Sequence, residues 1–206
     1  MKRAKTSKAW MKEHVNDFFV KQAKKEGYRS RAAYKLLEIV ERDHLLRPGM
    51  TVVDLGAAPG GWSQVAAEKL AGKGRVIALD RLQMTPLPGV TFIQGDFCEP
   101  YVLTELKKSL GGFPLDLVIS DMSPNISGIG VSDQARSMHL AELALEFSIE
   151  RLNSGGNFLV KMFQGSGFEQ FLLVMRATFG RVVTRKPEAS RGRSSEMYLL
   201  GLEKRN

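Results

Sequence analysis

Short apolar runs alternate with helix-like stretches along most of this 206-residue chain, and the alternation restricts the fold more than any other feature. Short apolar runs that stop at turn residues are typical of buried strands. Seven of them predict strands at 51–55, 75–80, 90–94, 115–120, 157–162, 181–185 and 196–202. Helices are predicted at 30–43, 61–71, 101–109, 134–152 and 167–178, the fourth followed by a glycine-containing stop at 153–156.

This order of elements predicts an α/β protein with one seven-stranded sheet. Strands that are connected through helices lie parallel, with helices on both faces of the sheet. No helix separates the last two strands, so we expect the last strand to be antiparallel. In such a sheet the ligand lies at the carboxyl ends of the strands. The residues that directly follow each strand are therefore the first candidates for function.

The first strand leads into a glycine-rich turn, DLGAAPGGW at 54–62. This turn is not the G-x-G-x-x-G of dinucleotide-binding enzymes, because Ala58 and Pro59 interrupt that spacing. Proline also lacks the backbone N–H that would help to hold a pyrophosphate. The pattern resembles instead the first motif of S-adenosylmethionine methyltransferases. The alternative is an ordinary glycine-rich turn.

Acidic residues follow the second and third strands. Asp80 ends the second strand, 24 residues after Gly56, where a carboxylate can accept hydrogen bonds from ribose hydroxyls. Asp96 follows the third strand; in S-adenosylmethionine enzymes an acid here commonly meets the adenine amino group, with an apolar neighbour such as Phe97 against the ring. Because Asp also favours turns, a purely structural role is the alternative for both.

The turn after the fourth strand, SDMSPN at 120–125, indicates the type of reaction. Enzymes that methylate exocyclic base amines carry an aromatic residue here, which stacks on the base. This turn has no aromatic residue. The sequence therefore weakens the case for base N-methylation and leaves hydroxyl methylation.

Three charged residues lie in otherwise apolar segments. Lys161 is in the fifth strand, and since a buried lone ammonium is costly, it needs partners; Asp121 and Glu196 are the candidates. Glu196 is itself unexpected at the head of an apolar strand, and Lys35 lies on the helix before the sheet, where it could flank the site. The alternative for Lys161 is a lysine at the sheet edge whose amine reaches solvent.

Positive charge is concentrated near the N-terminus. Residues 1–35 hold eleven Lys and Arg against three Asp and Glu, a difference equal to the whole net charge of +8. A neutral body with a cationic arm suggests a polyanionic partner such as nucleic acid, with a solubilising tail as the alternative. We place a basic, RNA-contacting arm at 1–29 and the main domain at 30–206. The expected RNA surface extends to basic residues near the last two strands: Arg181, Arg185, Lys186, Arg191 and Arg193.

Composition excludes other classes of protein. The single cysteine, Cys98, rules out a disulfide framework, and three scattered histidines have no metal-ligand spacing. No apolar run is long enough for a membrane span, and no apolar leader follows the first charges. We therefore expect a cytoplasmic protein without a metal. A single domain of this kind can act as a monomer, which is our expectation here.

The chain is similar over nearly its whole length to the FtsJ/RrmJ family of ribosomal RNA 2′-O-methyltransferases. The matching stretches are 27–36, 53–63, 94–96, 120–125, 160–165, 186–191 and 194–198. The resemblance implies a Rossmann-like methyltransferase fold, S-adenosylmethionine as the methyl donor, and a catalytic tetrad. The tetrad falls on Lys35, Asp121, Lys161 and Glu196, and the cofactor contacts fall on Gly60, Trp62, Asp80, Asp96 and Asp121.

The resemblance also implies a substrate. The target would be a uridine of 23S ribosomal RNA, in the A-loop, within the assembled large ribosomal subunit. Related branches of the family methylate tRNA or mRNA caps. Two other functions stay open: a non-catalytic RNA-binding factor for ribosome assembly on a methyltransferase scaffold, and a dinucleotide oxidoreductase. Methyl transfer to ribosomal subunits would exclude the first, and a bound nicotinamide cofactor would support the second.

Overall fold

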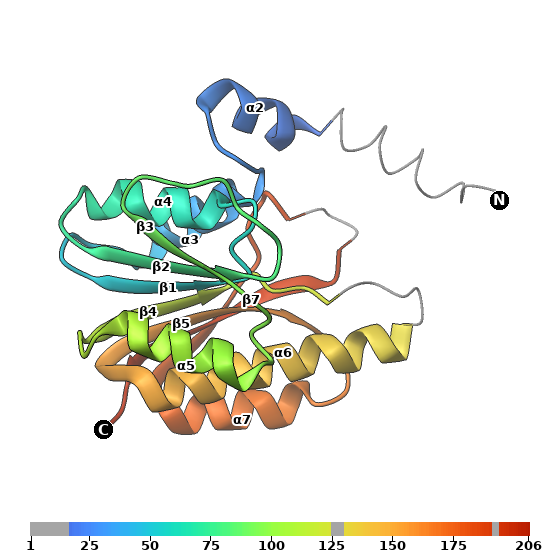
Figure 1. Ribbon diagram of the computed structural model, residues 1–206. Helices are drawn as coiled ribbons and strands as arrows, with labels where there is room; N and C mark the ends of the chain where they lie inside the picture. Colours follow the sequence, from blue (N-terminus) through green and yellow to red (C-terminus); the bar gives the residue numbers. More distant parts are fainter. Residues whose placement is uncertain (1–16, 125–129, 191–193) are drawn as a thin grey trace.

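A computed structural model of the chain describes residues 17–124, 130–190 and 194–206, which form one seven-stranded sheet with helices on both faces (Figure 1). The strands are β1 (Thr51–Leu55), β2 (Arg75–Asp80), β3 (Val90–Gln94), β4 (Leu115–Ser120), β5 (Leu152–Phe163), β6 (Phe179–Arg185) and β7 (Glu196–Lys204). Their order in the sheet is β3-β2-β1-β4-β5-β7-β6. The first five strands pair in parallel, whereas β7 is antiparallel to both β5 and β6. The predicted fold class and its antiparallel last strand are confirmed.

Two groups of helices cover the sheet. On one face lie α3 (Ala32–Asp43) and α4 (Gly61–Leu70), and on the other α5 (Pro100–Leu110), α6 (Gly130–Arg151) and α7 (Phe168–Thr178). A further helix, α2 (Phe18–Glu26), lies outside the α3/α4 layer (Figure 1). Within the three described ranges, no helix is long and apolar enough to cross a membrane.

Both faces of the central strands are buried. In β1, Val53 packs in the cluster formed with α5, α6 and α7, whereas Val52 packs in the cluster formed with α3 and α4. The same division separates Val118 from Leu117 in β4. Because successive side chains of a strand point to opposite faces, burial on both sides requires a continuous apolar run. This explains why these strands could be predicted from their composition.

Boundaries differ from the prediction at two main places. Helix α6 begins at Gly130 rather than at residue 134, and β5 begins at Leu152 rather than at residue 157. The segment 153–156, which was predicted to be only a helix stop, lies within β5, because Leu152 pairs with Leu115 before a register irregularity. Helix α2 occupies part of the range that the sequence assigned to the basic arm.

Candidate active site

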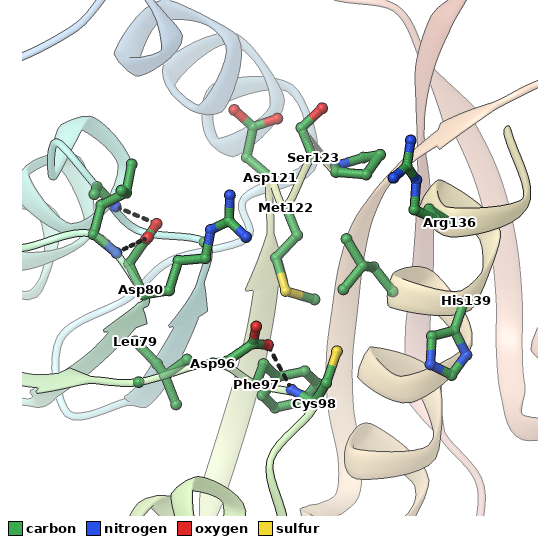
Figure 2. Close-up of a pocket in the computed structure, with 17 residues that line it drawn as sticks. Leu79, Asp80, Asp96, Phe97, Cys98, Asp121, Met122, Ser123, Arg136 and His139 are labelled. Atoms are coloured by element: carbon green, nitrogen blue, oxygen red, sulfur yellow. Dashed lines mark hydrogen bonds between the residues drawn. The ribbon is translucent and has the colours of Figure 1, made fainter. Parts of the chain in front are cut away.

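The loops after β1, β2, β3 and β4 surround a cavity of about 480 Å³ at the carboxyl ends of these strands (Figure 2). Each loop contributes one of Gly56, Asp80, Asp96 and Asp121 to the wall. Helix α6 supplies part of the opposite wall, and Figure 2 shows its His139 across the cavity from Asp96. A cavity of this volume is in the range that holds cofactor-sized molecules.

Backbone N–H groups fix the two acidic residues that line the cavity after β2 and β3. Asp80 accepts from the N–H of Ala58 at 2.9 Å through Oδ2 and from the N–H of Leu82 at 2.7 Å through Oδ1. Asp96 Oδ1 accepts from the N–H of Cys98 at 3.0 Å. Each carboxylate oxygen has more than one lone pair, so both groups remain able to accept hydrogen bonds from a ligand. Over the described ranges, no three His, Cys, Asp or Glu side chains are grouped to hold a metal ion.

A glycine lets the turn after β1 approach the turn after β4. Gly56 has a φ of +78°, and a Cβ atom added there would lie 2.7 Å from Cγ of Met122 and 2.9 Å from its Cα and N atoms. Real Cβ atoms essentially never lie so close to backbone atoms. The close contact between these two turns, which both line the cavity, therefore requires glycine at this position.

Replacing Gly56 by alanine should lower the free energy of unfolding by about 2–4 kcal/mol, from the left-handed backbone and the clash together. Urea denaturation measures this loss. Gly112→Ala is the matched control, because Gly112 has a φ of +76° and open space around its Cβ position. Equal losses in the two variants would show that the contact with Met122 contributes nothing.

Asp54 lies near the end of β1, at the start of the motif that forms the glycine-rich turn, and is completely buried. Its Oδ2 accepts from the Ser63 hydroxyl at 2.6 Å, whereas its Oδ1 has no hydrogen-bond partner among the described residues. Burial, followed by the nearby charges of Asp121 and Asp80, raises the pKa of Asp54 to about 7, although the Ser63 hydrogen bond opposes the shift. Asp54 is therefore a buried acid that titrates near neutral pH.

The fold brings the four residues of the predicted tetrad together as two ion pairs. Lys161 Nζ lies 3.1 Å from Asp121 Oδ1 and donates to the Asp121 backbone oxygen at 2.6 Å. Lys35 Nζ lies 2.7 Å from Glu196 Oε1. The two lysines, from β5 and α3, are 8% and 9% exposed. Of the two partners predicted for Lys161, the structure pairs it with Asp121, while Glu196 pairs with Lys35.

Tyr198 connects the two ion pairs and was not singled out from the sequence. Its hydroxyl accepts from Lys35 Nζ at 3.1 Å and donates to Asp121 Oδ1 at 2.8 Å. The antiparallel register places Tyr198 directly opposite Lys161. A period-of-two argument along β7 could have found it, because residues two apart in a strand face the same side and Tyr198 follows Glu196 by two.

Electrostatics keep the bridge between the ion pairs in one protonation state. Burial alone would raise the pKa of Asp121, but Lys161, then Lys35 and the Tyr198 hydroxyl, more than offset it, and the pKa is lowered. Burial and then the charges of Asp121 and Glu196 raise the pKa of Tyr198 well above its ordinary value. At neutral pH Asp121 is therefore a carboxylate and Tyr198 a hydrogen-bond donor.

Two residues predicted to contact the cofactor, Gly60 and Trp62, are not among those that line the cavity. Trp62 is buried, donates through Nε1 to the Ala32 oxygen at 2.8 Å, and its ring centroid lies 5.6 Å from that of Tyr198. Trp62 thus packs between α3 and the bridging tyrosine. This packing supports the position of the tetrad.

Arg29 connects the segment before α3 to two loops that border the cavity. Its guanidinium donates to the backbone oxygens of Pro59, Thr85 and Pro86. A Cβ atom at Gly60 would lie 3.1 Å from this side chain. In the sequence, Arg29 is only one of the basic residues of the predicted arm. The structure shows that it joins the glycine-rich turn to the loop after β2.

Other basic residues expected at the RNA surface also have internal partners. Arg185 forms a two-fold contact with the Asp43 carboxylate, and Lys186 donates to the Ser194 oxygen at 2.8 Å. Arg31, which follows the predicted arm, also has an internal partner, Asp17, at 3.0 Å. Arg191 and Arg193 lie outside the described residues.

The order of the seven strands, with an antiparallel strand between β5 and β6, and the cavity at the carboxyl ends define a Rossmann-like methyltransferase fold. Within this class, the chain belongs to the FtsJ-like methyltransferase family, which matches residues 28–204. The family predicted from the sequence is confirmed, and with it the assignment as an enzyme.

Individual relatives agree with the family. The chain is 79% identical over 206 residues to "Ribosomal RNA large subunit methyltransferase E" of Nitrosospira multiformis, covering 100% of both chains. It is 67% identical, with the same coverage, to the protein of that name in Methylobacillus flagellatus. A crystal structure from Plasmodium falciparum, described as a ribosomal RNA methyltransferase, superposes with a TM-score of 0.77 at 33% identity and covers 86% of this chain and 98% of that one.

Proposed function

We propose that this methyltransferase transfers a methyl group from S-adenosylmethionine to the ribose 2′-hydroxyl of a uridine in 23S ribosomal RNA. The target we propose is in the A-loop of the assembled large subunit, and the protein acts in the cytoplasm as a monomer. The names of its relatives support ribosomal RNA of the large subunit as the substrate. The observation that carries the type of reaction is the pair of buried lysines, each ion-paired, beside the cavity.

The cavity suits S-adenosylmethionine. It is large enough for a nucleoside-sized molecule, and Asp80 and Asp96 are fixed by backbone N–H groups as acceptors for ribose and adenine. The proposal includes the predicted cofactor contacts of Gly60 and Trp62, since both belong to the glycine-rich turn whose Gly56 and Ala58 line the cavity. When bound, this cofactor supplies a methyl group on a positively charged sulfur. An oxygen nucleophile attacks the methyl carbon in line with the sulfur, which leaves as a neutral thioether.

The ribose hydroxyl would be a further partner of the Lys161 amine. The amine already donates to the backbone oxygen of Asp121 and forms an ion pair with the carboxylate of that residue. If Lys161 is neutral, its lone pair accepts the proton of the ribose hydroxyl as a general base. If it is an ammonium, an N–H of the amine stabilises negative charge on the attacking oxygen. Lys35 and Glu196 would orient the ribose, and Asp121 would hold Lys161.

Tyr198→Phe should lower kcat about 10- to 100-fold, because hydrogen bonds to charged groups contribute about 1.5–3 kcal/mol and the variant loses two of them. Cofactor affinity, measured by calorimetry, should be unchanged. Tyr101→Phe is the control, since Tyr101 is 67% exposed on α5. Wild-type kcat in Tyr198→Phe would mean that the bridge does not position the ion pairs for catalysis.

RNA binding by the segment before α2 can be tested by deleting residues 1–16, which contain five Lys and Arg and one Glu. Because each phosphate contact releases counterions, the deletion should weaken RNA binding about tenfold at moderate salt and reduce its salt dependence. Filter binding at several salt concentrations measures both. Cofactor affinity is the control, and unchanged RNA affinity would contradict a contact between this segment and RNA.

Methyl transfer to isolated ribosomal subunits tests the proposed function itself. Large subunits from cells that lack this gene should accept tritiated methyl groups from S-adenosylmethionine, whereas subunits that already carry the modification should not. Nucleotide mapping of the product then identifies the ribose. Transfer to tRNA alone would replace the proposed substrate, and binding to subunits without transfer would favour an assembly factor.

A further inference from the structure

Helix α2 carries a solvent-exposed aromatic side chain, and the function proposed so far gives this side chain no role. Phe18, the first residue of α2, is 69% exposed. One exposed apolar side chain carries little information by itself. Phe18 differs because of the residues aligned with it, the rings that support it and the ion pair that links its helix to α3.

Phe18 shares one side of α2 with two lysines. Lys21 and Lys25 follow it by three and seven residues, and residues at this spacing lie on one face of a helix. Both lysines are exposed, whereas Val20 and Ala23 on the other side are buried. The outer face of α2 therefore combines an aromatic ring with two positive charges.

A row of rings holds Phe18 in place. Its ring centroid lies 5.4 Å from that of Phe19, edge to face, and Phe19 lies 5.5 Å from Tyr34. Tyr34 in turn lies 5.6 Å from Tyr28. Of these four rings, which connect α2 to α3, Phe18 is the exposed end. The contact with Phe19 supports one side of the Phe18 ring and leaves the exposed side for a flat ligand.

Ion pairing links the start of α2 to the start of α3. Asp17, which caps α2, pairs with Arg31 at 3.0 Å. Arg31 precedes Lys35 by four residues, one helical turn, and also donates to the oxygen of Ala189 in the segment that leads to Glu196. Figure 1 shows α2 outside the helix layer that carries Lys35. Asp17, directly before Phe18, is thus linked through Arg31 to the start of α3 and to the segment that leads to Glu196.

We propose that the face formed by Phe18, Lys21 and Lys25 binds the RNA strand next to the target nucleotide. An unpaired base stacks on Phe18, and the phosphates of the same strand lie against the two lysines. Aromatic side chains stack on bases of any sequence, and lysines attract phosphate. The inference rests on the proposed RNA substrate and adds the surface that positions it.

Steady-state kinetics on large ribosomal subunits that lack the modification test the stacking contact. Phe18→Ala should raise KM for the subunits about tenfold, within the range for loss of one stacked base, while kcat and cofactor affinity stay at the wild-type values. Phe18→Trp should restore KM. Phe113→Ala is the matched control, since Phe113 is 56% exposed at the opposite end of the strands, before β4.

The salt dependence of KM tests the contribution of Lys21 and Lys25 separately from that of Phe18. The double variant Lys21→Gln, Lys25→Gln should lower the slope of log KM against log salt by about one for each lost phosphate contact. The control variant Lys69→Gln, Lys73→Gln, in which both lysines are exposed near the end of α4, should leave the slope unchanged.

Unaltered KM in Phe18→Ala, or an equal change in Phe113→Ala, would overturn the proposal. So would a wild-type dimer that Phe18→Ala dissociates, because a second copy would then cover this face. If the wild-type protein transfers no methyl group to the subunits, the proposed function fails instead.

Discussion

Replacing Lys161 by alanine should lower kcat for methyl transfer about 1,000-fold or more, at the upper part of the range for loss of an acid–base group. The amine donates to the backbone oxygen of Asp121 at 2.6 Å and lies 3.1 Å from the carboxylate oxygen Oδ1 of the same residue, and no other described lysine makes these contacts. Lys161 is not among the residues that line the cavity, so cofactor affinity should stay near the wild-type value. Single-turnover transfer and calorimetry measure the two quantities.

A second substitution separates the two roles of this lysine. Arginine is not deprotonated in proteins, so Lys161→Arg supplies charge but no base. Partial activity in Lys161→Arg would assign the residue to charge stabilisation, and a loss as large as in Lys161→Ala would support the general base. Lys204→Ala is the control, because Lys204 caps a backbone oxygen of Leu152 at the far end of β7. Wild-type rates in Lys161→Ala would remove the residue from the mechanism.

Asp54→Asn should stabilise the fold at alkaline pH but not at acidic pH. In the folded protein the pKa of Asp54 is raised from 3.8 to about 7. Below the lower value both states are protonated. Between the two values the unfolded chain loses its proton while the folded protein keeps it, so stability falls as pH rises. Above the upper value the full cost of burying the charge, about 4 kcal/mol, is present.

Denaturant titrations of wild type and Asp54→Asn across this range measure the effect. Asparagine is neutral at every pH and retains an oxygen to accept from Ser63. The stability advantage of the variant should therefore grow from about pH 4 to about pH 8 and then level off, by up to about 4 kcal/mol. A constant difference between the two proteins would show that Asp54 does not change its protonation in the folded state over this range.

The fold followed from the sequence because each central strand is buried on both faces. Val52 and Val53 face opposite helix layers, and only a continuous apolar run satisfies both. The predicted start of β5 was wrong because the pairing of β5 with β4 begins before the glycines at 155 and 156. A register irregularity separates this first pair from the rest, and local composition does not reveal it. The tetrad residues could be named from the family motifs. Which carboxylate pairs with which lysine depends on how α3 lies against the sheet, and no local pattern specifies that.

Residues that act through packing or backbone contacts were harder to predict. Trp62 lies in a motif associated with the cofactor, yet its indole bonds to α3 and packs on Tyr198. Arg29 carries a charge that suggests RNA, yet its partners are three carbonyl oxygens from loops up to 57 residues away. Such contacts join parts of the chain that are remote in sequence. They become visible only when the loops are placed in space.

The direction of β7 determines how this scaffold can diversify. Because β7 is antiparallel to β5, the end of β5 lies beside the beginning of β7. Lys161 is therefore close to the end of its strand, whereas Glu196 is the first residue of its strand. Only Glu196 follows directly on the segment 186–195 that enters β7. Insertions in that segment would therefore change the surface near Glu196 that contacts the substrate. The strand that bears Lys161 would keep its register with β4, and the cofactor cavity would stay intact.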